Sequence, residues 1–149
     1  MNTSIAIFLH DHRYDRLYQA VSISLAATSM GWSCHLFMFY QALASYIDGT
    51  WDDIRAGDRA ERPGQDALGS EPGWMTALRK GFDTSNIPSL YEMLERSRSG
   101  EGELKVYGCS ASVKLLGLNL DDVRKRVDEV VGLPTMLAIA GNATHALYI

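Results

Sequence analysis

The stretch SIAIFLHDHRYDRLYQAVSISLAATSMGWSCHLFMF, residues 4–39, decides the fold. It opens at 4–9 with a short apolar run rich in β-branched residues, which is typical of a strand buried on both faces. After the polar residues HDHRYD, apolar side chains recur at helical spacing from Asp15 onward, and Gly31 follows where a helix would end. A second apolar run, WSCHLFMF at 32–39, comes next. Strand, helix and strand in this order predict a parallel βαβ unit.

The rest of the chain continues this alternation. YQALASYID indicates a short helix that ends at Gly49, and Ser89 and Glu92 have the spacing of a capping box at the start of another helix. Further elements are expected as a strand at 104–108, helices at 110–117 and 120–126, a strand at 127–131, a helix at 133–141 and a strand at 145–149. Five strands that alternate with helices predict a three-layer α/β/α fold with a mainly parallel five-stranded sheet.

Residues 49–86 differ from their surroundings because they are rich in glycine and carry charges of both signs. We expect one domain over 1–149, with a long loop inserted at about 49–86. Trp51 and Trp74 argue against simple disorder in this loop, since large apolar rings are rare in segments that never pack. They are expected to cover the edge of the core or to meet another subunit. WMTALRKGF, residues 74–82, predicts a short helix.

The composition excludes several classes of protein. The 149 residues carry a formal net charge of −4, and the Lys and Arg residues are scattered along the chain. Nucleic acid is therefore not an expected partner, because binding a polyanion requires a concentrated basic surface. The chain has no apolar stretch of the roughly 20 residues that cross a bilayer and no secretory signal at its N-terminus. A cytoplasmic protein without a membrane partner is expected.

The two cysteines have different surroundings. They are far apart in the sequence and form no CxxC pattern, so two separate thiols are expected in place of a disulfide. Cys34 lies in the middle of the second predicted strand. The alternation of that strand places it among core residues, on the face opposite Phe37 and Phe39. An inert packing role is therefore expected for Cys34.

Cys109 stands where the third strand gives way to a helix. In open parallel sheets, ligand sites gather beyond the carboxyl ends of the strands. The backbone N–H groups of Ala111 and Ser112 would stabilise a thiolate at a helix start. The small residues Gly108, Ser110 and Ala111 leave room for a substituent on the sulfur. The alternative is that Cys109 is a small hydrophobe buried at a strand end, as free cysteines often are.

His10 and His12 follow the first strand and are expected at the same sheet edge as Cys109. His10 could hold the thiolate as an ion pair or pass a proton, and a surface loop role stays open for both histidines. His10, His12 and Cys109 together form only a weak zinc pattern, so no metal site is expected. Asp128 and Glu129 are acid or base candidates, or they mark the start of a strand in a solvated turn.

These segments carry a family resemblance. KVYGCSASVKLLGL, followed by VDEVVGLPTMLAIA and THALYI, resembles the DsrE/DsrF-like family of small sulfur-transfer proteins, in which a KIYAC-SxS-LMGI type of segment precedes VDEVxG and a final short strand. FLHDHRYDRLYQAVSISLAATSMGWSCHLFMFYQAL is similar to the family's first strand, helix and second strand. The resemblance covers roughly residues 4–47 and 87–149.

The resemblance implies a flavodoxin-like three-layer fold, assembly into trimers or hexamers, and a cysteine that carries sulfur as a persulfide. By position that cysteine is Cys109. The implied partner is a TusA-like sulfur carrier protein or a related sulfurtransferase, and the exchange requires no cofactor. Trp51, Trp74 and Tyr91, read as exposed aromatic residues, also favour a homo-oligomer.

The leading hypothesis is a cytoplasmic sulfur carrier or sulfurtransferase with Cys109 as its catalytic residue. The candidate assisting residues are His10, His12, Ser110, Ala111 and Ser112. The alternative is a non-catalytic assembly or small-ligand-binding subunit in which Cys109 is a packed residue.

Overall fold

The structure is a computed structural model, and it describes residues 3–53 and 73–149. The strands are β1 (Ser4–Leu9), β2 (Ser33–Met38), β3 (Glu103–Cys109), β4 (Glu129–Val131) and β5 (His145–Tyr148). The helices are α1 (Tyr14–Ser29), α2 (Tyr40–Asp48), α3 (Gly73–Thr84), α4 (Leu90–Arg98), α5 (Ser110–Leu115), α6 (Leu120–Arg124) and α7 (Leu133–Gly141). Each expected element is present, although β4 is shorter than expected.

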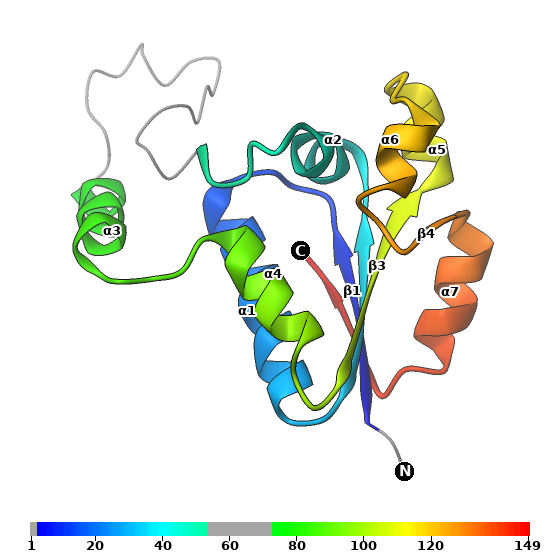
Figure 1. Ribbon diagram of the computed structural model, residues 1–149, viewed down its shortest axis with the longest axis horizontal. Helices are drawn as coiled ribbons and strands as arrows, with labels where there is room; N and C mark the ends of the chain where they lie inside the picture. The colour runs from blue at the N-terminus through cyan, green and yellow to red at the C-terminus, as the bar shows by residue number, and fades with distance from the viewer. Residues whose placement is uncertain (1–2, 54–72) are drawn as a thin grey trace.

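The five strands form one sheet in the order β4-β3-β2-β1-β5, and every neighbouring pair is parallel. Helices α1 and α4 lie on one face of this sheet and α7 lies on the other, while α2, α5 and α6 gather where the strands end (Figure 1). The predicted three-layer α/β/α fold is confirmed, and the sheet is parallel throughout. The final connection, through α7, runs from β4 at one edge of the sheet to β5 at the other edge, where β5 pairs with β1.

Local sequence signals set several helix ends as predicted. The Ser89 hydroxyl accepts the Glu92 N–H at 3.1 Å, and the Glu92 carboxylate accepts the Ser89 N–H at 2.8 Å, which completes the capping box of α4. The Asn119 side chain caps α6 in a similar way. Helix α2 ends at Gly49, whose φ of 75° is a left-handed conformation that suits glycine.

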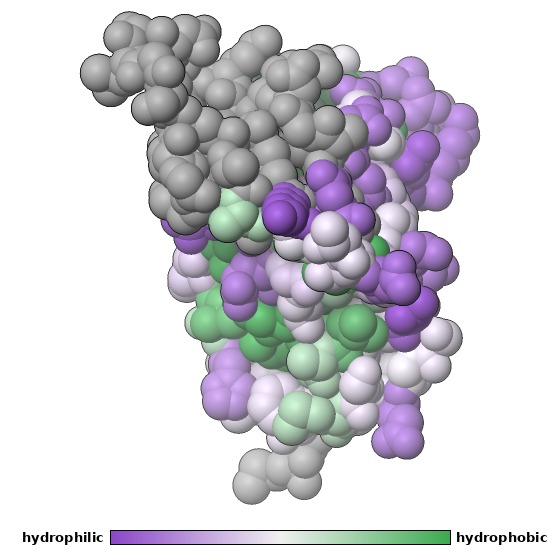
Figure 2. All heavy atoms as spheres, turned by 90° about the vertical axis from the view of Figure 1, so that its left-hand side faces the viewer, coloured by the Kyte–Doolittle hydropathy of each residue, from purple (hydrophilic) through white to green (hydrophobic). Residues whose placement is uncertain are grey.

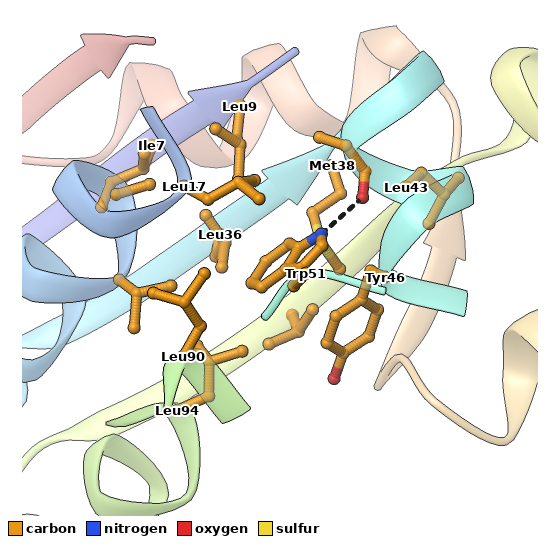
Figure 3. Packing of buried hydrophobic residues seen from close by; sticks show 14 of the residues in the cluster. Ile7, Leu9, Leu17, Leu36, Met38, Leu43, Tyr46, Trp51, Leu90 and Leu94 are labelled. Atoms are coloured by element: carbon orange, nitrogen blue, oxygen red, sulfur yellow. Dashed lines mark hydrogen bonds between the residues drawn. The ribbon is translucent and has the colours of Figure 1, made fainter. Parts of the chain in front are cut away.

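The core has two parts because both faces of the sheet are buried. On the face toward α1 and α4, β-strand residues such as Leu36 and Met38 pack against Leu17, Leu90 and Leu94 from the two helices (Figure 3). A smaller cluster on the face toward α7 holds Ala6, Phe8, Phe37, Phe39, Tyr107, Cys109 and Met136. The predicted alternation of β2 is thereby confirmed, since its odd and even residues pack in different clusters.

Trp51 belongs to the core, so reading it as an exposed aromatic residue was wrong. It is 0% exposed, and its indole N–H donates to the carbonyl of Ala42 at 3.1 Å. Its ring lies 4.9 Å from the ring of Tyr46 (Figure 3). It also lies 5.9 Å from the ring of half-buried Tyr91. The tryptophan therefore covers the edge of the core, which was one of the two roles expected for it.

Part of the segment expected as a loop at 49–86 is helical. Helix α3 spans Gly73–Thr84 and contains the short helix predicted at 74–82. The side chain of Trp74 and residues 54–72 lie outside the described part of the chain, and with them the middle of the expected loop.

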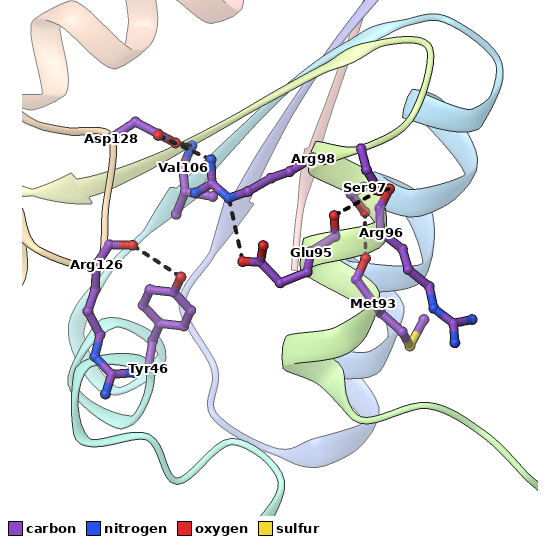
Figure 4. A network of polar contacts seen from close by, with 10 residues as sticks. Tyr46, Met93, Glu95, Arg96, Ser97, Arg98, Val106, Arg126 and Asp128 are labelled. Carbon is purple, nitrogen blue, oxygen red and sulfur yellow. Dashed lines mark hydrogen bonds and ion pairs between the residues drawn. The ribbon is translucent and has the colours of Figure 1, made fainter.

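Asp128 ties the short strand β4 to the rest of the sheet. Its carboxylate accepts the N–H of Val106 at 2.7 Å and a guanidinium N–H of Arg98 at 3.1 Å, and its own N–H donates to the Val106 carbonyl at 2.8 Å (Figure 4). Arg98 comes from the last turn of α4. Asp128 and Glu129 are exposed and stand where β4 begins, so the expected solvated turn at a strand start is confirmed. The structural bonds of the Asp128 carboxylate were not predicted.

A close backbone approach fixes the turn before β3. Gly102 donates its N–H to the carbonyl of Thr28 at 2.8 Å. A Cβ atom at this position would lie 2.1 Å from the carbonyl oxygen of Trp32. Residue 102 must therefore be glycine for the turn to pack against the end of α1.

Replacing Asp128 by alanine is expected to lower the free energy of unfolding by about 2 kcal/mol, because two charge-assisted hydrogen bonds are lost and the N–H of Val106 is left without its acceptor. Urea denaturation followed by circular dichroism measures this change. Glu101→Ala, which removes an exposed carboxylate from the turn before β3, is the control and should change stability little. Equal stabilities of the two variants would contradict this account of Asp128.

Candidate functional site

A row of side chains crosses the carboxyl ends of four strands on the α7 face of the sheet. Gly108 is paired with Met38, and Met38 with Leu9. The residues that follow, Cys109, Phe39 and His10, are therefore neighbours along the same edge. On the other side, Cys109 is paired with Val131 of β4. The row runs Val131, Cys109, Phe39, His10, and we call it the edge row.

An aromatic layer lies one step below the edge row. It consists of Tyr107, Phe37, Phe8 and Tyr148 from four adjacent strands. Consecutive ring centroids are 4.9, 4.9 and 4.6 Å apart. Met136 of α7, which is fully buried, packs in the same cluster. The side chain of Cys109 therefore lies in apolar surroundings.

Cys109 is the last residue of β3 and occupies the position just before α5, so its predicted place between strand and helix is confirmed. Its side chain accepts no hydrogen bond from the N–H groups of α5, which the expected stabilisation of a thiolate by Ala111 and Ser112 requires. It is 4% exposed, and its thiol is not in a disulfide. A reagent or a partner must approach it from the edge at which the strands end. The alternative hypothesis, that Cys109 is only a packing residue, also requires this burial.

The three residues after Cys109 have different environments. Ser110 and Ala111 are exposed, whereas Ser112 is buried and its hydroxyl accepts the N–H of Tyr40 at 3.0 Å. Tyr40 has a φ of 40°, a left-handed conformation that costs a residue with a side chain about 1–3 kcal/mol. Ser112 thus holds the strained start of α2 against α5. The sequence carries no local signal for this contact.

The two histidines lie where the first strand ends, as predicted. The ring of His10 is exposed and lies 4.6 Å from the ring of Phe39. Because β2 separates β1 from β3, roughly 10 Å separates the backbones of His10 and Cys109. His12 lies beside Asp11, with 4.0 Å between its Nδ1 and a carboxylate oxygen. The structure thus brings His10 into the edge row, two strands from the thiol, and leaves His12 outside that row.

Cys34 lies on the opposite face of the sheet from Cys109. It is fully buried among the residues that pack against α1. Burial raises the pKa of its thiol to about 11, and a hydrogen bond with Ser24 opposes this only in part. The expected packing role of Cys34 is confirmed by its place in the core.

A contact between His35 and Tyr107 on the α7 face was not predicted from the sequence. Nδ1 of His35 lies 3.2 Å from the hydroxyl of Tyr107. Burial lowers the pKa of His35 and raises that of Tyr107 to about 12. Lys105 and Glu129 form an ion pair of 3.9 Å on the neighbouring strands. The alternation of β2 places His35 on the same face as Phe37 and Phe39, as expected, but no local signal indicates its partner Tyr107.

Two further findings concern residues 3–53 and 73–149. No group of three His, Cys, Asp or Glu side chains there is arranged to hold a metal ion. No helix in these ranges has the length and apolar character that a membrane span requires.

The fold places the chain among three-layer α/β/α proteins with a parallel sheet and a cysteine at the carboxyl edge. No known family model matches the chain, and no curated protein matches it. The resemblance to DsrE/DsrF-like proteins therefore remains a prediction from the residues quoted for it.

Raising the pH from 9 to 11 is expected to weaken the fold through Cys34. The unfolded thiol ionises near its ordinary pKa, whereas the folded thiol ionises at about 11, so the folded state binds more protons over this interval. The free energy of unfolding should therefore fall with rising pH, by up to about 2 kcal/mol from this group. Urea denaturation at several pH values measures the slope.

Cys34→Ala removes the titrating group and should flatten the slope over the same interval. Buried tyrosines with raised pKa values, such as Tyr46, contribute equally to both proteins and cancel in the comparison. Identical slopes for wild type and Cys34→Ala would show that Cys34 does not carry the effect.

Proposed function

We propose that this protein is a cytoplasmic sulfur carrier or sulfurtransferase that holds sulfane sulfur as a persulfide on Cys109. The observation that carries the proposal is the position of Cys109 in the edge row, where β3 ends and α5 begins. This edge is where parallel sheets bind their ligands. The resemblance to DsrE/DsrF-like proteins supports sulfur as the cargo and a TusA-like carrier or another sulfurtransferase as the partner.

The proposed exchange balances without a cofactor. The Cys109 thiolate attacks the terminal sulfur of a donor persulfide, R–S–SH. A bond forms between Sγ of Cys109 and that sulfur, the S–S bond of the donor breaks, and the donor leaves as the thiolate R–S⁻. An acceptor thiolate then repeats the same step on the Cys109 persulfide and regenerates the thiolate. The sulfur changes carrier, and no external oxidant or reductant is consumed.

The apolar surroundings of Cys109 suit a persulfide intermediate. Phe39, Tyr107 and Met136 share its buried cluster, so little water reaches the sulfur. A dry site limits hydrolysis and oxidation of reactive intermediates. Cys34 is set apart from this chemistry because burial on the other face raises the pKa of its thiol to about 11.

Polysulfide treatment followed by intact-mass measurement tests the proposal. Wild type is expected to gain one sulfur atom that dithiothreitol removes, and Cys109→Ser is expected to gain none. Cys34→Ala is the matched control and should load like wild type. The proposal fails if wild type gains no sulfur or if Cys109→Ser gains as much as wild type.

A second candidate function is a non-catalytic assembly or small-ligand-binding subunit, and the 4% exposure of Cys109 favours it. In that case the thiol is a packing group, and alkylating reagents should label it slowly at neutral pH. Rapid labelling of Cys109 ahead of Cys34 would count against this candidate.

We also propose that the protein forms a homo-oligomer through the outer side of α7. This nine-residue helix, LPTMLAIAG, has no charged side chain, and of its residues only Met136 is buried. Leu133 and Leu137, one turn apart, are 50% and 51% exposed. Helices that are apolar all round are normally covered by other protein. The resemblance favours a trimer or a hexamer.

A second area with exposed apolar side chains lies on the side of α1 and α4, and it serves as the comparison for α7. Figure 2 shows the side of the molecule that carries α1 and α4, on which apolar side chains gather between polar margins. Met30, at the end of α1, is 64% exposed. Both areas are therefore exposed in the single chain.

Light scattering at micromolar concentration is expected to give an oligomer for wild type and a monomer for Leu133→Lys/Leu137→Lys. Lysine at both positions would place two charges in an apolar contact, where they would lack partners. Met30→Lys is the comparison variant and should keep the oligomer. A monomeric wild type would contradict the assembly, and dissociation by Met30→Lys alone would contradict the assignment to α7.

A further inference from the structure

A groove of about 490 Å³ opens between α5 and α6, beside the site at Cys109. Its apolar lining comes from Val113 on α5, Leu118 in the turn between the two helices, Leu120 at the start of α6 and Val130 on β4. Ser110 also lines the groove. This volume lies within the range of pockets that bind small ligands, about 300–1,000 Å³. The groove can therefore hold a few side chains of an extended segment.

The charged side chains that line the groove are both positive. Lys114 is near the end of α5 and Arg124 is the last residue of α6, and both are exposed. Within the described ranges neither forms an ion pair with an acidic side chain. Asp122 pairs with Lys125 at 3.0 Å, and Asp121 is not among the groove residues. The groove thus combines an apolar lining with two cations that have no acidic partner among the described residues.

The groove meets the sheet edge beside Cys109 at two residues, Ser110 at the start of α5 and Val130 on β4. Ser110, which lines it, directly follows Cys109 in the chain. Val130, which also lines it, directly precedes Val131, the residue paired with Cys109. Val113, Leu118 and Val130 pack with the cluster on the α1 face, whereas Cys109 packs with the cluster on the α7 face, so the groove and the thiol lie on opposite sides of the sheet edge. A segment that leaves the groove must pass over the exposed Ser110 to reach the thiol.

We propose that this groove docks an extended segment of the protein that exchanges sulfur with Cys109. Charge complementarity identifies the chemistry of that segment, in which Asp or Glu alternates with aliphatic residues next to a reactive cysteine. The aliphatic side chains fill the groove, and the acidic ones pair with Lys114 and Arg124. The inference rests on the proposed function, because it describes how the partner of Cys109 is recognised.

Peptide binding tests the docking separately from the sulfur chemistry. The probes are two cysteine-free peptides with a neutral dye, one of Leu, Gly and Glu and the other with Lys in place of Glu. By fluorescence anisotropy, wild type is expected to bind the acidic peptide, and more weakly as salt screens the charges. Lys114→Glu/Arg124→Glu should weaken this binding about ten-fold. No binding of the acidic peptide up to about 1 mM would overturn the proposal.

A matched variant controls for net charge. Lys80→Glu/Arg96→Glu makes the same change in charge on α3 and α4, away from the groove. It is expected to bind the acidic peptide like wild type at moderate salt. An equal loss of binding in both double variants would show a general charge effect and would overturn the assignment to the groove.

A second measurement follows the reaction at Cys109. The same peptides, each with one cysteine as a mixed disulfide with thiopyridine, form a disulfide with Cys109 and release thiopyridone. Wild type should react about ten-fold faster with the acidic peptide than with the basic one. Lys114→Glu/Arg124→Glu should lose this preference and keep its rate with dithiodipyridine, a small neutral disulfide.

The outcomes separate the docking from the proposed function. If Cys109 takes up no sulfur from polysulfide, the proposed function fails whatever the peptides do. If Cys109 takes up sulfur but reacts equally with both peptides, or if the groove variant keeps the preference, the docking proposal is overturned and the proposed function stands.

Discussion

The parallel pairing of all five strands is the constraint on which the rest of the structure depends. It aligns the carboxyl ends of the strands at one edge, and it requires that both faces be covered. Residues along each strand must then alternate between two separate cores. The two cysteines follow this rule: Cys34 faces α1 and Cys109 faces α7. The two thiols therefore have different surroundings, because the cysteines lie on opposite faces of the sheet and at different positions along their strands.

The neighbourhood of Cys109 is built by contacts between elements distant in the sequence. Phe39 and Val131 flank it from β2 and β4, and Ser112 fixes the strained Tyr40 at the start of α2. The result is a buried thiol at an edge whose surface is polar and accessible at Ser110. Burial of this kind protects a reactive sulfur and restricts which partners reach it. Under the proposed function, the same packing would serve both carriage and selectivity.

Local patterns in the sequence predicted most elements and the alternation of β2, because apolar period, glycines and capping residues act over a few positions. They did not predict which strands are neighbours. β5 pairs with β1 from the other end of the chain, and no local signal encodes that return. The bonds of Asp128 and the neighbours of Cys109 depend on strand order, and for that reason they appeared only in the structure.

The turn at Gly102 limits which sequences can adopt this fold. Cys109 is one packing group among several in its cluster, whereas any side chain at residue 102 would collide with the carbonyl oxygen of Trp32. Chains that keep this architecture without Cys109 should therefore still carry glycine immediately before β3. Distant relatives with other activities are better recognised by that glycine than by the cysteine.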